Sequence, residues 1–423
     1  MDIEISKVGA IGDGVCLNTK IIQKAIDDCN ATGGGKVVVS GGVYLTGKLI
    51  LKSNVTLHVA AGATLLGAEA CENYPETENV KHVDSAKLPR LRNSCLIFAD
   101  ECENIGITGE GTIDCNGDKY VVLREGEIKG WPYKRIDAPT PPRVVFFTGC
   151  RNVKVEDITM VNQPAGWSYW IHDCDFVTFD KVKIIANVEY PNNDGIHINC
   201  SRNVTISNSS IICGDDCIIV RANSVSLKEN KVCEKVVVTN CNLTSYSSGI
   251  RIGWQNDGTI RNCTFSNIVM TDTTIGIGII LPYRKPVTYE ITCPDPNVPV
   301  SSDVGREETL IENLSFNNII MDKNFSGPVR IDINSNPLVT CKAIRNIYFS
   351  NMHVRGPVLP FIRGRENCHV ENVWFTDCNF EVTDGTEFGD CSGHGAYYAR
   401  GQFNMYTQHV DNLRMNNTTI SVV

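Results

Sequence analysis

Several features that would assign the chain to a common class are missing from its sequence. No apolar run reaches the roughly 18 residues that a membrane-spanning helix needs. The opening residues, MDIEISKVGAIGDG, contain neither the basic region nor the apolar stretch of a secretory signal peptide. Acidic residues outnumber basic ones by 48 to 39, which gives a formal net charge of −9. These absences argue against a membrane partner and against broad, nonspecific binding to nucleic acid.

The cysteines also lack the spacings that would give them a special role. The chain contains 19 cysteines but no CxxC pair and no Cys/His cluster at zinc spacing. Since free cysteine packs as a small hydrophobic side chain, we expect these cysteines to be structural and reduced, which favours a cytoplasmic protein. A secreted or periplasmic protein without its leader would begin in the same way. We expect no metal or organic cofactor, and the sequence predicts no particular oligomeric state.

A short pattern of Asn or another polar residue, followed by alternating apolar positions, returns along most of the chain. Its copies start roughly 24 to 33 residues apart through the central region. Short strands rich in Val, Ile, Thr and Phe alternate with turns of Asn, Asp and Gly. Clear copies are NVTLHVAAGATL, NVKVEDITM, NVTISNSSI, NLSFNNIIM and NVWFTDCNF, which begin at Asn54, Asn152, Asn203, Asn313 and Asn372.

No helical stretch separates successive copies, so the repeat is not a βαβ array. The pattern predicts an all-β solenoid, a parallel β-helix in which each copy contributes to one coil. A helical periodicity over residues 18–31 predicts a helix that caps the N-terminal end, with Asn18 or Thr19 as N-cap and Gly33 at its end. Segments rich in Pro, Gly and charge, about 116–142 and 281–308, predict inserted loops. We expect residues 1–423 to form a single domain.

Two adjacent carboxylates interrupt an otherwise apolar stretch, IICGDDCIIV, residues 211–220. A regular strand would point either Asp215 or Asp216 into the core, at a high cost in free energy, so we expect the strand to bend at Gly214. A third carboxylate, Asp194 in PNNDGIHINC, precedes Asp215 by 21 residues (215 − 194), about one coil. Residues one coil apart stack at about 4.8 Å in such a solenoid, which predicts Asp194 beside the pair.

Three carboxylates on one face have a chemical use. Paired carboxylates in unlike protonation states can supply the acid and the base that hydrolyse a glycosidic bond. The alternative is that these aspartates only form turns, since Asp-Gly and Gly-Asp are ordinary turn dipeptides. Turn formation explains one such dipeptide well, but it explains three aspartates in register poorly.

Longer segments of the chain resemble a known family. GAIGDGVCLNTKIIQKAIDDC and RVVFFTGCRNVKVEDITMVNQPAGWSYWIHDC resemble the opening and the central coils of glycoside hydrolase family 28, the polygalacturonase family, and the resemblance covers essentially the whole chain. It implies a single-stranded right-handed parallel β-helix. The family's Asn-Thr-Asp motif corresponds to Asn192, Asn193 and Asp194, with Asn in place of Thr, and its Gly-Asp-Asp motif is intact at 214–216. The resemblance implies that Asp215 is the general acid, and that Asp194 and Asp216 orient and deprotonate the water, with inversion at the anomeric carbon.

Two motifs of the family are absent. Its Gly-His-Gly motif corresponds to the first residues of SSGIRIGW, with Ser248 in place of the histidine. Its Arg-Ile-Lys motif, which grips the substrate carboxylate, falls on IGIGII, where Gly278 and Ile280 take the place of the two cations. Arg251 is a new cation next to the first motif and can bind a carboxylate bidentately from another direction.

Other polar and aromatic residues fall near the acids by coil spacing. Trp167, Trp170 and His172 lie about one coil before Asp194 and can form a platform for a sugar, although Trp170 fits a core position equally well. Arg221, Arg284 and Lys285 are further cations for acidic sugars, with ordinary salt bridges as the alternative. The candidate substrate-binding residues are Arg251, Ser248, His197, Trp167, His172, Arg143, Trp254 and Asn192.

The sequence thus favours an inverting glycoside hydrolase that acts on a pectin-related or uronic-acid-containing carbohydrate, and we expect it to trim oligosaccharides from one end. A polysaccharide lyase or epimerase on the same scaffold is one alternative, because lyases use Lys or Arg as a base and Arg251 is available. A non-catalytic glycan-binding β-helix is another, because two motifs of the family are absent.

Overall fold

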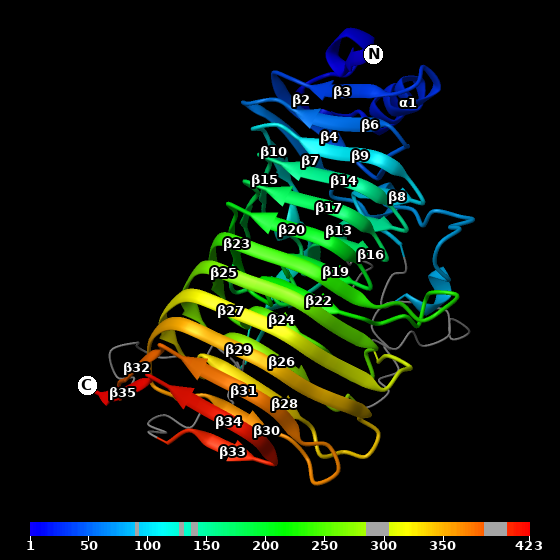
Figure 1. The fold of residues 1–423 in the computed structure, drawn as a ribbon. Coiled ribbons are helices and arrows are strands. Elements are labelled where there is room, and N and C mark those ends of the chain that lie inside the picture. The colour runs from blue at the N-terminus through cyan, green and yellow to red at the C-terminus, as the bar shows by residue number, and fades with distance from the viewer. Residues whose placement is uncertain (89–92, 127–130, 137–142, 285–303, 385–403) are drawn as a thin grey trace.

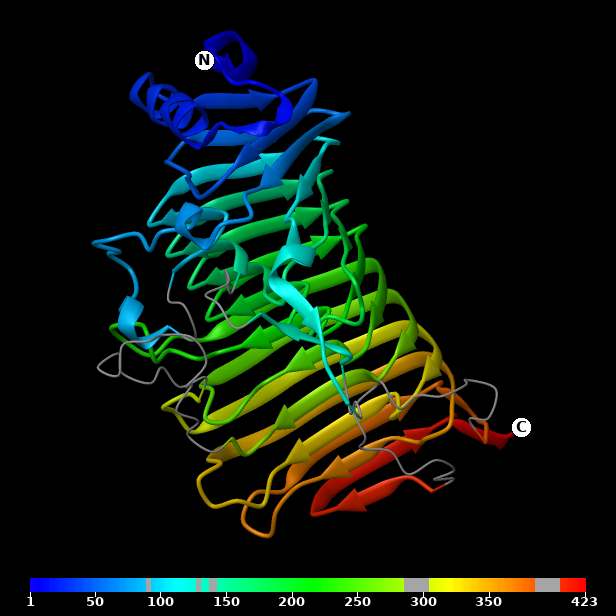
Figure 2. The same cartoon turned by 180° about the vertical axis from the view of Figure 1, so that it is seen from behind.

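The chain winds into a right-handed parallel β-helix, seen from two sides in Figures 1 and 2. The structure is a computed structural model that describes residues 1–88, 93–126, 131–136, 143–284, 304–384 and 404–423. The N-terminus and helix α1 (Thr19–Ala31) lie at one end of the stack of coils, and the C-terminus lies towards the other end. The fold class predicted from the sequence is confirmed. Among the described residues, no helix is long and apolar enough to cross a membrane.

The described strands form two main sheets that share the coils. The smaller sheet contains β5 (Leu49–Ile50), β8 (Ile97–Asp100), β13 (Arg143–Thr148), β16 (Trp167–His172), β19 (Ile196–Asn199), β22 (Ile218–Arg221), β24 (Ser248–Ile252), β26 (Ile275–Leu281), β28 (Val329–Ile333), β30 (Phe361–Arg363) and β33 (Tyr406–Gln408). The larger sheet contains β1 (Asp2–Glu4), β2 (Asp13–Leu17), β3 (Gly35–Val39), β4 (Gly42–Thr46), β6 (Val55–Val59), β7 (Ala63–Gly67), β9 (Glu103–Thr108), β10 (Thr112–Asp114), β14 (Arg151–Glu156), β15 (Thr159–Val161), β17 (Asp175–Asp180), β18 (Lys183–Ile185), β20 (Arg202–Ser207), β21 (Ser210–Cys213), β23 (Cys233–Ser245), β25 (Thr259–Thr273), β27 (Thr309–Asn324), β29 (Cys341–Gly356), β31 (Val370–Thr376), β32 (Asn379–Val382), β34 (Val410–Asn416) and β35 (Thr419–Val422). Short 3-10 segments lie at Ile5–Val8, Cys71–Asn73, Ser85–Lys87 and Gly117–Tyr120.

Asparagines form the corner at which the larger sheet bends. β23 pairs with both β20 and β21, and Figure 1 shows the long strands β23, β25, β27 and β29 curving round this edge. Asn240, Asn267 and Asn318 stand at the bend with φ of 56°, 55° and 53°, a left-handed conformation that Asn tolerates better than most residues. Their side chains also bond from coil to coil, for example Asn318 Nδ2 to Asn267 Oδ1 at 2.8 Å. The Asn that begins each copy of the sequence pattern is left-handed as well, with φ of 62° at Asn54 and 57° at Asn313, so both rows of Asn are corner residues.

Apolar side chains fill the space inside the coils. Ile and Val alternate inward along the strands, and the rings of Phe265, Phe316, Phe349 and Phe375 stack in one column with centroids 4.9, 5.0 and 4.8 Å apart. Burying one such side chain stabilises the fold by roughly 1.5–3 kcal/mol, and every coil buries several. Most described cysteines are also buried here, and none of those the structure describes forms a disulfide.

Helix α1 covers the N-terminal end of this core, as the periodicity predicted. Ile22, Ala25, Ile26 and Cys29 are buried on its inner face. The predicted side-chain cap is absent: Asn18 occupies the N-cap position, but its side chain bonds to the backbone at Ile11, at 2.8 Å and 3.0 Å.

The segment predicted as an inserted loop over 116–142 contains a small hairpin in its described part. β11 (Val121–Leu123) and β12 (Tyr133–Arg135) pair antiparallel, and Figure 2 shows them in cyan across the stacked coils. Arg135 Nε donates to the Ala165 carbonyl at 2.6 Å, which fastens the hairpin to the β-helix. The second predicted loop, 281–308, lies mostly outside the described residues, although Leu281 still belongs to β26.

A third excursion, residues 68–96 between β7 and β8, was not predicted. Lys48 holds its two sides together, with Nζ 3.0 Å from the Pro75 carbonyl and 2.8 Å from the Asn93 carbonyl. His82 ties it to the coils through Asp173 Oδ2 at 3.0 Å, and this hydrogen bond raises the pKa of His82 above its usual value of 6.5. The excursion is thus fastened onto the outer face of the smaller sheet.

Candidate active site

The stretch IICGDDCIIV forms two strands, not the single bent strand expected from the sequence. β21 ends at Cys213 in the larger sheet, β22 begins at Ile218 in the smaller sheet, and residues 214–217 connect them. Asp215 and Asp216 lie in this turn, so neither has to point into the core from a strand. Gly214 therefore follows the end of a strand and does not bend one, because the next strand belongs to a different sheet.

Two glycines allow the coils to approach closely at this turn. A Cβ on Gly214 would lie 2.2 Å from the carbonyl oxygen of Tyr190, and one on Gly195 would lie 2.3 Å from that of Cys217. A methyl group does not fit at either distance. Trp131, from the hairpin segment, donates from Nε1 to the Gly214 carbonyl at 2.7 Å, so the hairpin also fixes the turn.

The strand register aligns the carboxylates of neighbouring coils. Ile196 pairs with Ile218, a spacing of 22 residues (218 − 196), which places Asp194 opposite Asp216 and leaves Asp215 one residue out of line. The next coil places Ser248 opposite Asp216, and backbone hydrogen bonds of 2.9 Å join each pair of coils here. The sequence spacing of 21 residues thus predicted the right neighbourhood, one residue short of the real coil.

The hydrogen bonds give the two adjacent acids different environments. Asp216 Oδ1 accepts from Ser247 Oγ at 2.8 Å and from the Ser248 backbone N–H at 3.0 Å, both on the next coil. Asp215 Oδ2 accepts from Asn192 Nδ2 at 3.1 Å, on the preceding coil. Asp194 and Asp216 are only 5% and 8% exposed, whereas Asp215 is more open. Asp216 is therefore held fixed, and Asp215 is the more accessible carboxylate.

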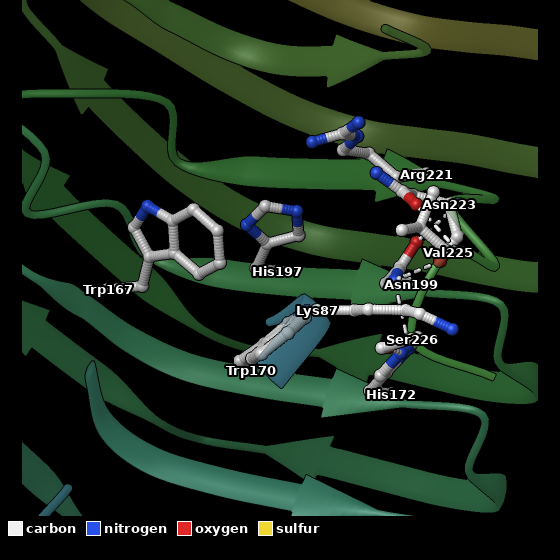
Figure 3. Close-up of a pocket in the computed structure, with 10 residues that line it drawn as sticks. All are labelled: Lys87, Trp167, Trp170, His172, His197, Asn199, Arg221, Asn223, Val225 and Ser226. Atoms are coloured by element: carbon white, nitrogen blue, oxygen red, sulfur yellow. Dashed lines mark hydrogen bonds between the residues drawn. The ribbon is translucent and has the colours of Figure 1, made fainter. Parts of the chain in front are cut away.

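A small pocket lies over β16, β19 and β22, and the last two of these strands directly follow Asp194 and Asp216 in the chain (Figure 3). Its free volume of about 20 Å³ has room for roughly one water molecule. His172 lines one end of it and is fully buried, with Nδ1 2.8 Å from Asn199 Nδ2 and Nε2 2.8 Å from Ser226 Oγ. Burial lowers the pKa of His172 to about 3, so the ring is neutral at ordinary pH.

Aromatic side chains form the other end of the pocket. The rings of Trp167 and His197 lie side by side, tilted by 45° with centroids 4.2 Å apart, and the register places Trp167 one coil before Asp194. Trp170 stacks on Phe146 at 4.4 Å and is 3% exposed. It therefore occupies a core position, the second of the two roles that the sequence allowed. Of this group, Trp167 and His197 lie nearest to the acids.

Arg143 lies beneath these aromatic rings. Its guanidinium carbon is 4.1 Å from the centroid of Trp170, 5.2 Å from that of Trp167 and 5.3 Å from that of Phe146, and the residue is 1% exposed. Cations over aromatic faces are stabilised electrostatically. The structure therefore places Arg143 as a support for the aromatic wall.

Arginines from β22, from β24 and from the residues after β26 surround Trp254. The guanidinium carbons of Arg251 and Arg284 each lie 4.9 Å from the ring centroid, and that of Arg221 lies at 5.3 Å. Arg221 is paired with buried Asp257 at 2.7 Å. Burial lowers the pKa of Arg251 to about 10, and the nearby arginines act in the same direction while Asp216 opposes them.

The sequence missed some residues of this site. Nothing in the sequence marks Ser247 except its place in the segment that replaces the family's Gly-His-Gly motif. Arg330 lies far along the chain, but the strand register places it opposite Gly278. Only a count of residues per coil across the 281–308 segment would have found Arg330. Lys285 lies outside the described residues. Within the described part of the chain, no group of three or more His, Cys, Asp or Glu could hold a metal ion.

Several known proteins are similar to this chain. A probable polygalacturonase of Vitis vinifera is 27% identical over 280 residues, 64% of this chain and 55% of that protein. An exo-poly-alpha-D-galacturonosidase of Dickeya chrysanthemi is 31% identical over 251 residues, 51% of this chain and 41% of that protein. The matched parts therefore span about half the length of these relatives.

The fold and the sequence profile agree with these similarities. A hyperthermoactive exopolygalacturonase from Thermotoga maritima superposes with a TM-score of 0.75 at 20% identity, over 100% of this chain and 92% of that one. The profile of glycosyl hydrolases family 28 matches residues 29–302, well over half of the chain, including all three aspartates. The chain belongs to glycosyl hydrolases family 28.

Proposed function

We propose that the protein is an inverting glycoside hydrolase that removes sugars from one end of a pectin-related, uronic-acid-containing oligosaccharide. Asp215 acts as the general acid and donates its proton to the leaving glycosidic oxygen. Asp194 and Asp216 orient a water molecule and take its proton as it attacks the anomeric carbon. The two hydrogen bonds on Asp216 Oδ1 fix the position of this carboxylate for that role. The greater accessibility of Asp215 suits a group that must reach the substrate.

One observation carries the proposal of end-on cleavage. Outward side chains of the smaller sheet are covered from Phe98 (0% exposed) through Trp170 (3%) to Arg251 (5%), and exposure rises only beyond them, to 41% at Tyr406. Val83 and Leu88 of the 68–96 excursion pack over the covered part. A sugar chain can therefore not run along the sheet past the acids, and it approaches from the C-terminal coils.

The structure also bears on the lyase alternative. A lyase needs a deprotonated base, and Arg251 is the cation nearest to the acids in that role. Even with its pKa lowered to about 10, Arg251 stays protonated at pH 7. A permanent cation suits binding of a carboxylate better than abstraction of a proton, so Arg251 favours the hydrolase.

Hydrolysis of α-1,4-linked tri- and hexagalacturonate by wild type and Asp215→Asn tests the proposal. We expect wild type to release the terminal unit first, with the opposite anomer formed initially by NMR, and Asp215→Asn to lose activity at least 100-fold while retaining its melting temperature. Random mid-chain cleavage would contradict end-on action. A product absorbing near 235 nm would indicate a lyase, and glycan binding with no cleavage of a broad pectic panel would indicate a binding protein.

A further inference from the structure

The outer face of the larger sheet carries an open groove in the same coils as the acids. It crosses β14, β17, β20 and β23, which lie one below another in Figure 1, and its free volume is about 630 Å³. The acids lie instead in the turns that lead into the smaller sheet, Asp194 before β19 and Asp216 before β22. None of the residues that line the groove belongs to the candidate active site.

Phe176 stands in this groove in an unusual backbone conformation. The row of corner residues that begins each copy of the repeat is left-handed, and most of its members are Asn that bond from coil to coil, as Asn152 Nδ2 does to Asn104 Oδ1 at 3.0 Å. Phe176 takes the place between Asn152 and Asn203 in this row, with φ of 55°. Asn tolerates this conformation, but a bulky side chain is disfavoured in it, and Phe176 is 48% exposed. Neither backbone preference nor burial explains a phenylalanine at this corner, and strained positions of this kind gather at functional sites.

Arg151 departs from the ion pairs of its row and contacts the Phe176 ring. Acidic and basic residues alternate in register beside this corner, and Arg202 and Arg261 each pair with a carboxylate of the preceding coil, at 3.3 and 2.7 Å. Arg151 stands in register with Glu103 of the preceding coil, yet among the described residues it has no ion pair. Its guanidinium carbon lies 5.3 Å from the centroid of the Phe176 ring, where the ring attracts a cation. The exposed guanidinium is therefore placed beside the groove.

The groove has more positive than negative charge. Lys154 pairs with Glu156 at 2.6 Å, whereas Lys235 is exposed and has no ion pair with any described residue. Together with Arg151, these lysines give a surplus of two positive charges (3 − 1) in a chain whose net charge is −9. Hydroxyl groups, such as that of Thr205, also line the groove. An exposed aromatic ring beside cations and hydroxyl groups suits an acidic sugar, because the ring packs against the apolar face of the sugar while the cations meet its carboxylates.

We propose that this groove is a second binding site for an acidic sugar chain, in which Phe176 packs against a sugar ring and Arg151 and Lys235 bind carboxylates. Phe176 and Lys235 are two strand spacings apart, about 10 Å, so they reach neighbouring units of one chain. The groove is open, so it takes an internal stretch of the chain and needs no chain end. This inference goes beyond the proposed function, because it concerns a face that takes no part in hydrolysis.

Binding of long α-1,4-linked polygalacturonate, measured by affinity electrophoresis in the Asp215→Asn background, tests the site without turnover. We expect Phe176→Asn to weaken binding roughly 10-fold and to keep or raise the melting temperature, because Asn suits the left-handed corner. Arg151→Gln and Lys235→Gln should each weaken binding roughly two- to fivefold. Arg345→Gln removes an arginine of the same row outside the groove, where it pairs with Glu312, and as the matched control it should leave binding unchanged.

The outcomes separate this site from other roles of the groove. Unchanged binding of the polymer by folded Phe176→Asn would overturn the site, and so would a sharp fall in its melting temperature, which would give the ring a structural role. Equal weakening of binding to neutral β-1,4-galactan would contradict an acidic ligand. Dimerisation of wild type but not of Phe176→Asn in light scattering would show that the groove binds a second copy of the chain. Because the readout is binding, absence of hydrolysis by wild type would contradict the proposed function alone.

Discussion

Asn192 on one coil donates a hydrogen bond from Nδ2 to Oδ2 of Asp215 on the next, at 3.1 Å. The backbone of Asn192 is left-handed, with φ of 57°, so the same residue forms the turn and positions the proposed general acid. In a β-helix the neighbouring coil is the nearest rigid support that a catalytic side chain can use.

This double role allows a clean test of positioning. Asn192→Gly keeps the left-handed backbone at no steric cost and removes only the amide. We expect kcat on trigalacturonate to fall roughly tenfold, as for the loss of one hydrogen bond to a charged group, with KM and melting temperature nearly unchanged. Asn192→Ala should show the same kinetic loss and a lower melting temperature. Equal kcat in wild type and Asn192→Gly would remove Asn192 from the mechanism.

Ser247 holds Asp216 in the same way, from the following coil. We expect Ser247→Ala to lower kcat roughly tenfold, because Asp216 Oδ1 would keep only its bond to the Ser248 N–H. Ser207→Ala is the matched control, since Ser207 Oγ also bonds an aspartate of the neighbouring coil, Asp180 at 2.7 Å, far from the site. Both variants should lose similar stability in urea, and only Ser247→Ala should lose activity.

Because His172 is buried and neutral in the folded protein, we expect the protein to lose stability in mild acid. Its pKa is about 3 in the folded protein and 6.5 in the unfolded chain, so between these values the unfolded state binds a proton that the folded state does not. Stability therefore falls as pH drops from 6.5 towards 3, by up to about 1.4 kcal/mol per pH unit from this group. Urea unfolding of wild type and His172→Gln over this range checks it. Parallel pH profiles for the two proteins would contradict the assignment.

Replacing Lys48 should uncover the end of the smaller sheet, because this side chain holds the 68–96 excursion in place. Replacing Lys48 with Met leaves the carbonyls of Pro75 and Asn93 without their shared donor, a loss of roughly 2–5 kcal/mol that falls on the 68–96 excursion. We expect faster hydrogen exchange in residues 71–88 and some internal cleavage of hexagalacturonate. Lys36→Met, at an exposed position, is the control. A purely terminal product pattern despite faster exchange would show that other elements close the site.

Most of the fold was predictable because short sequence segments, repeated along the chain, determine each coil. Each coil has its own Asn corner and its own alternating strands, so each copy of the repeat, such as those that begin at Asn54 and Asn313, predicts a coil of the solenoid by itself. The acids were predictable because two of them, Asp215 and Asp216, stand out against an apolar background. The register between the coils could not be predicted, because a difference of one residue in a turn changes which acid lies opposite Asp194.

The remaining parts depend on contacts between residues far apart in sequence. The 68–96 excursion has no periodicity, and single long-range contacts from Lys48 and His82 hold it in place. Arg330 joins Arg251 only because the coils bring positions 79 residues apart (330 − 251) within two strand spacings. Burial also decides the state of His172, and no neighbour in sequence reveals it.

The asparagine corners have a consequence for how the protein should be produced. Asn54, Asn262 and Asn313 each begin an Asn-X-Ser/Thr sequon on the exposed edge of the coils. Asn313 already uses Nδ2 to bond Asn262 Oδ1 at 3.1 Å. A eukaryotic secretory host attaches glycans to that same nitrogen as the chain emerges, before any corner can form. A bacterial host leaves the amides free to stack.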